Sequence, residues 1–305
     1  MKPKIINLAA LVLLLAACSS NDLNEVENQV EGDKVPVKVH VNEFTVSMVD
    51  FDEPTAGARI VTRAEDAEKY ANVQAVTLAF YDIKGTEVYK QTQAKSDKKT
   101  DTTFGEFSAD LQIGHYTMVA LGYNVGTGDV FTLTSPTQAA FTSEKPREMF
   151  CLTQSVTVTK SAPLDLEVTL NPISAWLNIL STDNAAPSVT KVRTTYSKGG
   201  KSFNPSSGLA ISDTGFSQTQ SANVESGKLS VHAFPMLFTD EETMDITIDA
   251  LDKNNVVLFS KVISDVNFKR GYKTTIQGPV FTAGTSSAGF MFNTGWGEEK
   301  TYTFE

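Results

Sequence analysis

The sequence has few of the residues on which catalytic and metal sites depend. Its 305 residues include only three histidines, which lie far apart in strand-like segments at His40, His115 and His232. No HExxH, CxxC or GxSxG motif occurs, so neither a zinc site nor a serine-hydrolase site has a sequence signature. The sequence therefore predicts a protein that is not an enzyme and that carries no metal ion or cofactor.

Cysteine is almost absent, which excludes a disulfide framework. Of the two cysteines, Cys18 ends an N-terminal apolar run and Cys151 lies alone in the middle of the chain. With lipid on Cys18, no intrachain disulfide can form, and the stability of the fold must come from packing. Cys151 follows Phe150 and is expected to be a small buried hydrophobic residue.

A membrane-spanning segment and a basic surface are also missing. The apolar run from Leu8 to Ala17 is too short for the ~20 residues that a bilayer-crossing helix needs. The formal net charge is −10, and no basic stripe interrupts the acidic excess. This charge argues against nucleic acid as a partner.

The first 18 residues have the order of a bacterial lipoprotein signal. Lys2 and Lys4 precede the apolar run, which ends in the sequence LAAC with Cys18 as its last residue. A short positive region, an apolar region and small residues before the cut describe a cleaved secretory signal. Cleavage before Cys18 would leave its thiol for lipid attachment. We therefore expect residues 1–17 to be a signal peptide and the mature chain to be anchored to a membrane by lipid.

A polar tether over residues 19–34 is followed by a segment with strict alternation. Apolar and polar residues alternate, and the pattern shifts by one position near Glu43, which predicts a strand with a β-bulge. The apolar positions of this strand are Val35, Val37, Val39, Val41, Phe44, Val46 and Met48. The strand therefore has one strongly apolar face.

The turn-rich segment after this strand admits two interpretations. The motif Thr62–Glu65 fits a capping box and predicts a short helix through Tyr70. The alternative is an exposed protease site between Arg63 and Ala64. Arg59 is a second candidate for the cut, although Arg63 lies closer to the first globular pattern.

From residue 73 onward the pattern is β throughout. Short alternating segments are separated by turn residues, and no helix longer than about two turns is expected. The strands are expected near residues 76–80, 88–93, 104–111, 115–124, 130–134, 155–159, 164–170, 170–180, 189–196, 208–211, 229–234, 244–251, 255–263 and 272–281. This spacing is typical of β-sandwiches. We expect an N-terminal sandwich over residues 64–168 and a C-terminal sandwich over residues 169–305, with a Gly/Pro/Ser-rich loop over 197–207.

The last residues form a separate apolar pattern. The aromatic residues all fall on even positions, at Phe290, Phe292, Trp296, Tyr302 and Phe304. On a continuous strand they would share one face, which Glu298 and Lys300 interrupt in the middle.

These features together resemble the Bacteroidales fimbrillins, or type V pilins. The resemblance rests on the lipobox ending at Cys18, the valine-rich strand before Arg63, the pattern VTLAFYDIKGTEVY…LQIGHYTMVALGYN, and a C-terminal strand around Trp296. The resemblance implies two tandem Greek-key, transthyretin-like β-sandwich domains after a lipoprotein signal. It further implies a prosegment over residues 18–63 that carries a strand.

The resemblance also implies a mechanism of assembly. An Arg-specific protease at the outer membrane removes the prosegment, whose strand fills a groove of the N-terminal sandwich in the precursor. A strand from another fimbrial subunit, commonly the C-terminal one, then fills this groove, so that residues 290–304 act as the donor strand. The expected product is a surface fimbria that supports adhesion and biofilm formation, with host or bacterial surface receptors as further partners.

Two other functions remain open from the sequence. A subunit that retains Cys18 and its prosegment would be a membrane anchor rather than a shaft or tip subunit. Alternatively, the chain is a surface lipoprotein whose β-sandwiches bind a glycan, which would require exposed aromatic residues on a sandwich face. Trp176 and Trp296 are the only tryptophans, and both lie in strand patterns that are typical of packing positions.

Overall fold

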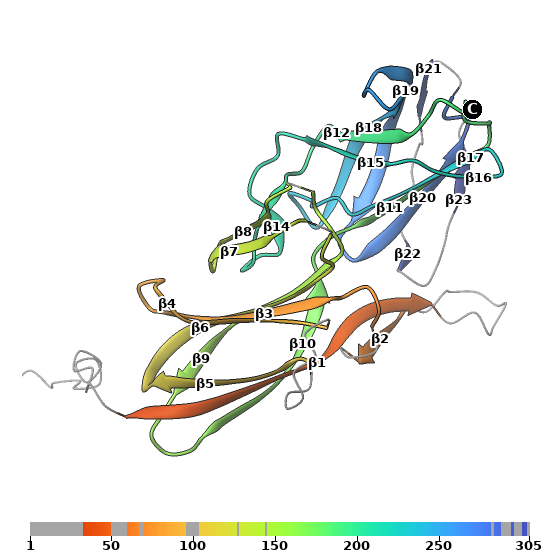
Figure 1. The fold of residues 1–305 in the computed structure, drawn as a ribbon. Coiled ribbons are helices and arrows are strands. Elements are labelled where there is room, and N and C mark those ends of the chain that lie inside the picture. The colour runs from red at the N-terminus through yellow and green to blue at the C-terminus, as the bar shows by residue number, and fades with distance from the viewer. Residues whose placement is uncertain are drawn as a thin grey trace, which may run out of the picture.

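The strands of this protein form two β-sandwiches and a small sheet between them (Figure 1). The computed structural model describes residues 33–49, 60–66, 70–95, 104–126, 128–143, 145–281, 284–287, 294–295 and 301–303. These residues form strands, turns and loops without any helix, and accordingly no membrane-crossing helix is found among them. The expectation of an all-β fold built from sandwiches is confirmed.

The N-terminal sandwich contains most strands of the first half of the chain. These are β1 (Lys34–Val49), β2 (Ile60–Asp66), β3 (Ala75–Asp82), β4 (Glu87–Ala94), β5 (Glu106–Gln112), β6 (Gly114–Tyr123), β9 (Met149–Val158) and β10 (Leu164–Pro172). They follow the order β2-β1-β10-β9-β6-β3-β4, and β5 also pairs with β1. β10 lies beside β1 for most of its length and joins β9 only at its last two residues. The sheet is therefore divided into two layers at β10.

The C-terminal sandwich consists of two separate sheets. Its strands are β11 (Trp176–Ser181), β12 (Lys191–Tyr196), β15 (Phe216–Ser221), β16 (Asn223–Glu225), β17 (Lys228–Ala233), β18 (Glu241–Leu251), β19 (Val257–Lys269), β20 (Tyr272–Gly278), β21 (Gly284–Ser287), β22 (Thr294–Gly295) and β23 (Thr301–Thr303). One sheet has the order β16-β17-β11-β20-β22, with β23 also on β20, and the other has the order β15-β12-β18-β19-β21. Aliphatic and aromatic residues from both sheets fill the core between them.

A four-stranded sheet joins the two halves. It has the order β14-β13-β8-β7, with β7 (Phe131–Ser135) and β8 (Gln138–Phe141) from the first half and β13 (Ser202–Asn204) and β14 (Leu209–Ala210) from the second. Phe203 pairs with Ala139 and belongs to a buried cluster that includes Tyr123 and Met236. The halves therefore share a core at their junction.

Four expectations about the strands were wrong, at the junction and in the adjoining part of the C-terminal sandwich. The predicted loop over 197–207 contains β13, and β8 and β15 were not predicted at all. The apolar segment 170–180 is not one strand, because residues Ile173–Ala175 leave β10 and pack at the junction before β11 begins. These strands are short, and β8 and β13 pair with each other from different halves of the chain, so local alternation alone does not reveal them.

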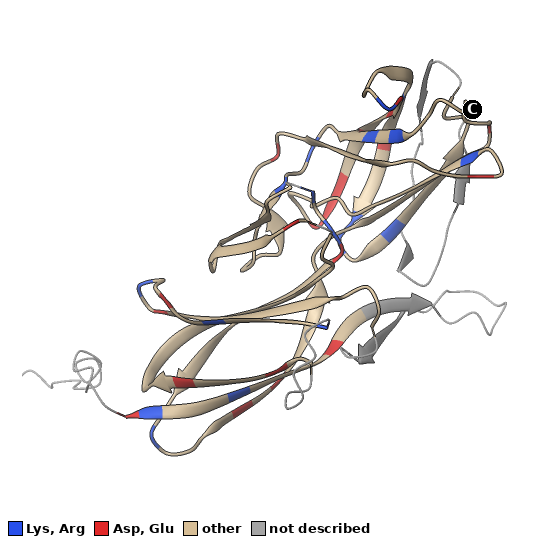
Figure 2. Cartoon of the chain, in the orientation of Figure 1, with Lys and Arg blue, Asp and Glu red and all other residues tan. Residues whose placement is uncertain are grey.

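Charged residues are distributed over both sandwiches. Figure 2 shows Lys, Arg, Asp and Glu scattered over both sandwiches, without a stripe of one sign among the described residues. The ion pairs include Arg193 with Asp249 and Arg147 with Asp129, at 2.6 and 2.9 Å. The surface therefore has the mixed charge of an ordinary globular protein.

Candidate functional site: strand β1 and the groove that holds it

Strand β1 lies inside the N-terminal sandwich and not at its edge (Figure 1). It pairs in parallel with β10 from Val37 to Phe44 and antiparallel with β5 from Lys34 to His40. Among the described strands, β5 pairs with no strand but β1. Without β1, the facing edges of β5 and β10 would lose their backbone hydrogen-bond partners, and the groove between them would be open.

The inward face of β1 is a row of apolar side chains. Alternate residues point into the core and are at most 9% exposed, namely Val35, Val37, Val39, Val41 and Phe44. They pack in one cluster with apolar residues of β5, β6, β9 and β10. At ~1.5 to 3 kcal/mol for each fully buried side chain, this face contributes roughly 7 to 15 kcal/mol before ordering costs. The strand is therefore a main part of the core.

The register of β1 shifts between Val41 and Glu43, which is where the sequence predicts a bulge. The shift explains why Val41 and Phe44 are both buried although they lie three positions apart. The Val41 N–H donates to the Gly105 carbonyl at 2.9 Å. Gly105 has a φ of +93°, and a Cβ there would lie 2.5 Å from the Val41 oxygen. The approach of β5 to the bulge thus requires glycine.

Phe44 is the largest side chain that β1 places in the core, and a pocket is built around it. Its ring lies 5.0 Å from that of Phe150 and 5.9 Å from that of Tyr70, between centroids. Its edge lies against Gly122, where an added Cβ would come within 2.5 Å of the ring. Phe44 is therefore an aromatic anchor for the end of the strand.

We expect Gly122→Ala to lower the free energy of unfolding by crowding the Phe44 ring of β1. The new methyl group would overlap the Phe44 ring, and overpacking of a core costs about 1 to 3 kcal/mol. Urea unfolding measures the loss, and Phe44→Leu in the same chain should restore part of it. The matched control is Gly114→Ala in the same strand, where a Cβ would have only ordinary contacts. Equal losses of unfolding free energy in the two glycine variants would contradict the claim that Gly122 makes room for Phe44.

Polar contacts line the outward face of β1. His40 Nε2 lies 2.9 Å from a carboxylate oxygen of Asp165, and the Asn42 amide donates to Glu167. At the start of the strand, Lys160 Nζ lies 2.7 Å from Asp33 and lowers the pKa of that carboxyl. Such exposed pairs add little stability. These pairs instead fix the register of β1 on β10, because a shift of β1 by one residue would break every one of these contacts.

A buried carboxyl group holds Tyr70, which is one wall of the Phe44 pocket. The Tyr70 hydroxyl donates to Glu148, which is 2% exposed. Burial raises the pKa of Glu148 to about 7, although hydrogen bonds from Tyr70 and Asn72 act in the opposite direction. The sequence does not mark Tyr70, Gly122 or Glu148 as part of the site. No local signal marks them, because each acts through contacts with distant segments.

The raised pKa of Glu148 predicts a pH dependence of stability. The folded chain holds this proton more tightly than the unfolded chain, whose glutamate has a pKa near 4.5. This contribution is complete below pH 4.5 and is lost as the pH rises to about 7, which amounts to about 3 kcal/mol. Denaturant unfolding of Glu148→Gln and of the original chain should therefore diverge between pH 4.5 and 8, with the original chain losing more stability. If the stability of both chains changed equally with pH, the raised pKa of Glu148 would be contradicted.

Residues Ile60–Asp66 form a strand, so the expectation of a short helix from Thr62–Glu65 through Tyr70 is wrong. β2 pairs antiparallel with the second part of β1, and Arg63 lies opposite Val46 while Val61 lies opposite Met48. The motif folds as a strand because β1 offers a partner edge, and tertiary pairing overrides a local capping signal. The Arg63–Ala64 bond therefore lies in an extended strand at the end of its sheet.

The described part of the C-terminal tail lies on the C-terminal sandwich. β23, which contains Tyr302, pairs in parallel with β20, and β22 pairs antiparallel with the start of β20. The remaining predicted donor-strand residues, and the predicted lipidation and alternative cleavage residues, lie outside the described residues: Phe290, Phe292, Trp296, Phe304, Cys18 and Arg59. The role of the tail as a donor strand stays a prediction.

Cys151 and the histidines, which the sequence offers as candidates for catalysis or metal binding, do not lie together in the structure. Cys151 is buried, and burial raises the pKa of its thiol to about 12. His115 lies near Thr157 and His232 near Ser230, on different sandwiches. In the part of the chain that is described, no three His, Cys, Asp or Glu side chains lie close enough to hold a metal ion.

Residues 36–304 match the sequence profile of a family of unknown function (DUF6562). The comparison with curated proteins found no match. The family match begins within β1 and extends beyond β23, so it covers both sandwiches together with the segment that fills the groove.

Solved structures with a similar fold come from fimbrial and adhesin proteins of the Bacteroidales. A candidate adhesin from Bacteroides ovatus is 12% identical, with a TM-score of 0.50 over 82% of this chain and 88% of that one. The fimbrial anchor protein Mfa2 from Porphyromonas gingivalis is 12% identical, with a TM-score of 0.43 over 75% and 82% of the two chains. A fimbrial assembly protein from Parabacteroides distasonis is 12% identical, with a TM-score of 0.39 over 81% and 92%. At these identities the likeness concerns the fold.

Proposed function

This chain belongs to the DUF6562 family, and we propose that it is a fimbrial subunit whose N-terminal sandwich exchanges β1 for a strand of another subunit. One observation carries the proposal. β1 completes the core from a central position, yet its only covalent link to the rest of the sandwich runs through the hairpin with β2, where Arg63 lies.

Cleavage after Arg63 would change β1 from a part of the chain into a separate ligand. In the uncut chain, the short connection to Ala64 keeps β1 at a high effective concentration beside the groove. After the cut, residues 18–63 are held only by side-chain burial and ladder hydrogen bonds, and another strand can compete for the same place. Backbone pairing with β5 and β10 would then give the affinity, and the row of apolar pockets would give the register.

The proposed replacement is the C-terminal strand of a neighbouring subunit, over residues 290–304. Its aromatic residues repeat with the same period of two as the valines of β1. Phe290, Phe292 and Trp296 are larger than valine, so the accepting sandwich must repack around them. The assembled groove is therefore expected to be wider than the groove around β1.

The proposal assigns a place and partners to the protein. Lipid on Cys18 holds the precursor at the outer membrane, and an Arg-specific protease releases the chain that starts at Ala64. The partners are then other fimbrial subunits, and the product is a surface fimbria that supports adhesion and biofilm formation. An unfilled groove would expose two strand edges, so β1 also protects the subunit from aggregation before assembly.

Arg63→Ala tests this function directly. We expect the variant to remain at full prosegment length in the membrane fraction and to form no fibres, whereas Arg59→Ala should be processed normally. Mass spectrometry of the membrane and sheared surface fractions gives both answers. Fibres made by Arg63→Ala at the normal level would overturn the proposed cut.

The pairing of β22 and β23 with β20 favours a second candidate function. A tail that stays on its own sandwich would suit a subunit that receives a strand but donates none, or a surface lipoprotein that does not polymerise. Such a protein would retain Cys18 and β1 at the cell surface. If the chain is recovered only in membranes, with its lipid and prosegment intact, this second function is supported over fibre assembly.

A further inference from the structure

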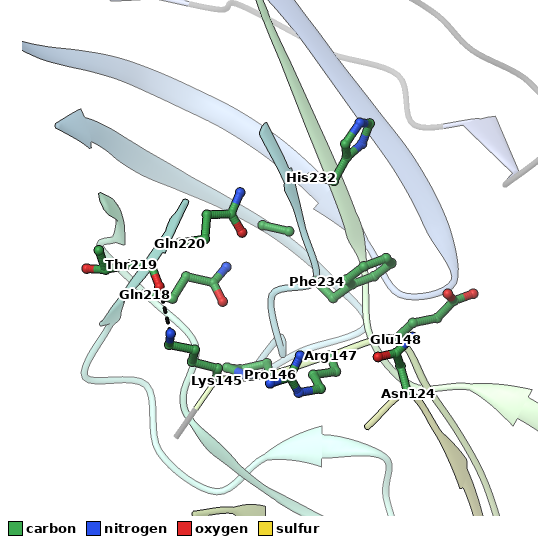
Figure 3. Close-up of a pocket in the computed structure, with 11 residues that line it drawn as sticks. Asn124, Lys145, Pro146, Arg147, Glu148, Gln218, Thr219, Gln220, His232 and Phe234 are labelled. Atoms are coloured by element: carbon green, nitrogen blue, oxygen red, sulfur yellow. Dashed lines mark hydrogen bonds between the residues drawn. The ribbon is translucent and has the colours of Figure 1, made fainter. Parts of the chain in front are cut away.

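A cavity lies at the junction of the two sandwiches, away from the β1 groove. Its volume is about 260 Å³. One wall comes from the segment Lys145–Glu148 and Asn124 of the first half, and the other comes from β15 and the end of β17 in the second half. Figure 3 shows side chains of both halves converging on this space. Ligand sites often form at such junctions, because each half can supply part of the wall.

Two cationic side chains on the first wall are held in place. Lys145 Nζ donates to the Thr219 carbonyl at 2.7 Å, which also ties the two halves together. Arg147 donates to Asp129 through Nε and Nη2, at 3.2 and 2.9 Å. Burial tends to raise the pKa of Asp129, but hydrogen bonds from Ser143, Arg147 and Thr142 outweigh it and lower the pKa to about 2. This ion pair therefore stays charged at any physiological pH.

Lys145 and Arg147 keep hydrogen-bonding capacity beyond these contacts. An ammonium group has three donors and a guanidinium group has five, of which these bonds use one and two. Within the described residues, no carboxylate lies within ion-pair distance of Lys145. The Glu148 side chain points away from Lys145 in Figure 3, toward its hydrogen bond with Tyr70. The cavity thus offers donors and positive charge.

The opposite wall combines carboxamides with an aromatic face. Gln218 is 8% exposed and is fixed by a hydrogen bond from its amide nitrogen to the Tyr196 hydroxyl at 3.0 Å. Gln220 lies two residues further along β15, so both side chains point to the same side of the strand. The half-buried ring of Phe234 lies across the cavity from Gln218 (Figure 3), and its centroid is 5.7 Å from that of Trp176.

We propose that this cavity binds a single anionic sugar unit, a hexuronate. A carboxylate can accept from Lys145 and Arg147, which are the strong donors of the site. Carboxamides both donate and accept, so Gln218 and Gln220 match the hydroxyl groups of a sugar. The C–H face of a pyranose ring is apolar and can pack on Phe234. The volume suits one sugar unit, because it lies below the ~300 to 1,000 Å³ of sites for larger ligands.

Calorimetric titration of the full chain with glucuronate and galacturonate tests the proposal, with glucose and galactose as neutral probes. We expect saturable binding of at least one uronate and at least about tenfold weaker binding of the neutral sugars, as for a lost charged hydrogen bond. Lys145→Met should weaken uronate binding by a similar factor. Lys84→Met, which alters an exposed lysine in the turn between β3 and β4, should leave it unchanged.

A second variant guards against a folding defect in Lys145→Met. Gln220→Glu places a negative charge on a partly exposed wall of the cavity, so it should abolish uronate binding while the thermal unfolding midpoint stays the same. No saturable uronate binding would overturn the proposal, as would binding that both variants retain. Equal binding of neutral sugars would overturn its anionic part. The inference does not depend on strand exchange, because fibre assembly and sugar binding are measured separately.

Discussion

The double substitution Val37→Asp and Val39→Asp is expected to prevent the N-terminal sandwich from folding in the full-length chain. Both valines are fully buried and lie between β5 and β10. A carboxyl group in an apolar core without a partner costs several kcal/mol, and two lost valines remove a further ~3 to 6 kcal/mol of burial. The sum is comparable to the ~5 to 15 kcal/mol by which whole domains are stable.

Circular dichroism and urea unfolding measure this effect. The matched control is Lys38→Asp, which introduces the same side chain at the exposed position between the two valines. The control should change the free energy of unfolding by no more than about 1 kcal/mol. A double variant that unfolds cooperatively near the original midpoint would mean that β1 is not part of the core in solution.

Deletion of residues 290–305 is expected to give a folded precursor that forms no fibres. The deletion removes β22 and β23, which both pair with β20. The two sheets keep the described core residues up to Val280 and Phe281, so we expect the shortened chain to fold. The proposed donor strand would be absent, and the groove of the next subunit would have nothing to accept. At about 10 to 20 kcal/mol of gross burial and ladder energy, the lost join could not be replaced by surface contacts.

Electron microscopy of sheared surface material and analytical size exclusion give the two readouts. Glu298→Ala with Lys300→Ala is the control, because it removes the polar interruption and keeps the aromatic residues; this chain should still polymerise. Normal fibres from the deletion variant would exclude the C-terminal strand as the donor. Such fibres would leave the groove around β1 to be filled by some other segment.

Some features of the groove follow from local sequence alone. The alternation from Val35 to Val41 and the phase shift at Glu43 predict β1 and its bulge, since one buried face and one solvated face impose a period of two. Each of these residues carries its own signal, and no partner needs to be known. β3 and β6 also lie where the sequence predicts strands, but their burial does not alternate. Val76, Leu78 and Phe80 of β3 pack in the core of the N-terminal sandwich, and Ala75, Ala79 and Tyr81 pack in the junction cluster, so both faces of this strand are buried.

Other features depend on segments that are distant in sequence. The motif Thr62–Glu65 has a valid capping pattern, and only the edge of β1 makes it a strand. Gly122 has no local turn to explain it, because its role is to leave room for Phe44. The cavity likewise joins Lys145 to β15 across the junction. Tertiary packing determines such pairings, and the periodicity of a single sequence does not predict them.

The most direct test of the account is the N-terminal sequence and intact mass of the subunit in purified fibres. We expect an unlipidated chain that begins at Ala64 and lacks β1. The same chain in the outer-membrane fraction should begin at a lipidated Cys18. Fibres built from subunits that still contain residues 34–49 would contradict strand exchange, because the groove would then be occupied by its own β1.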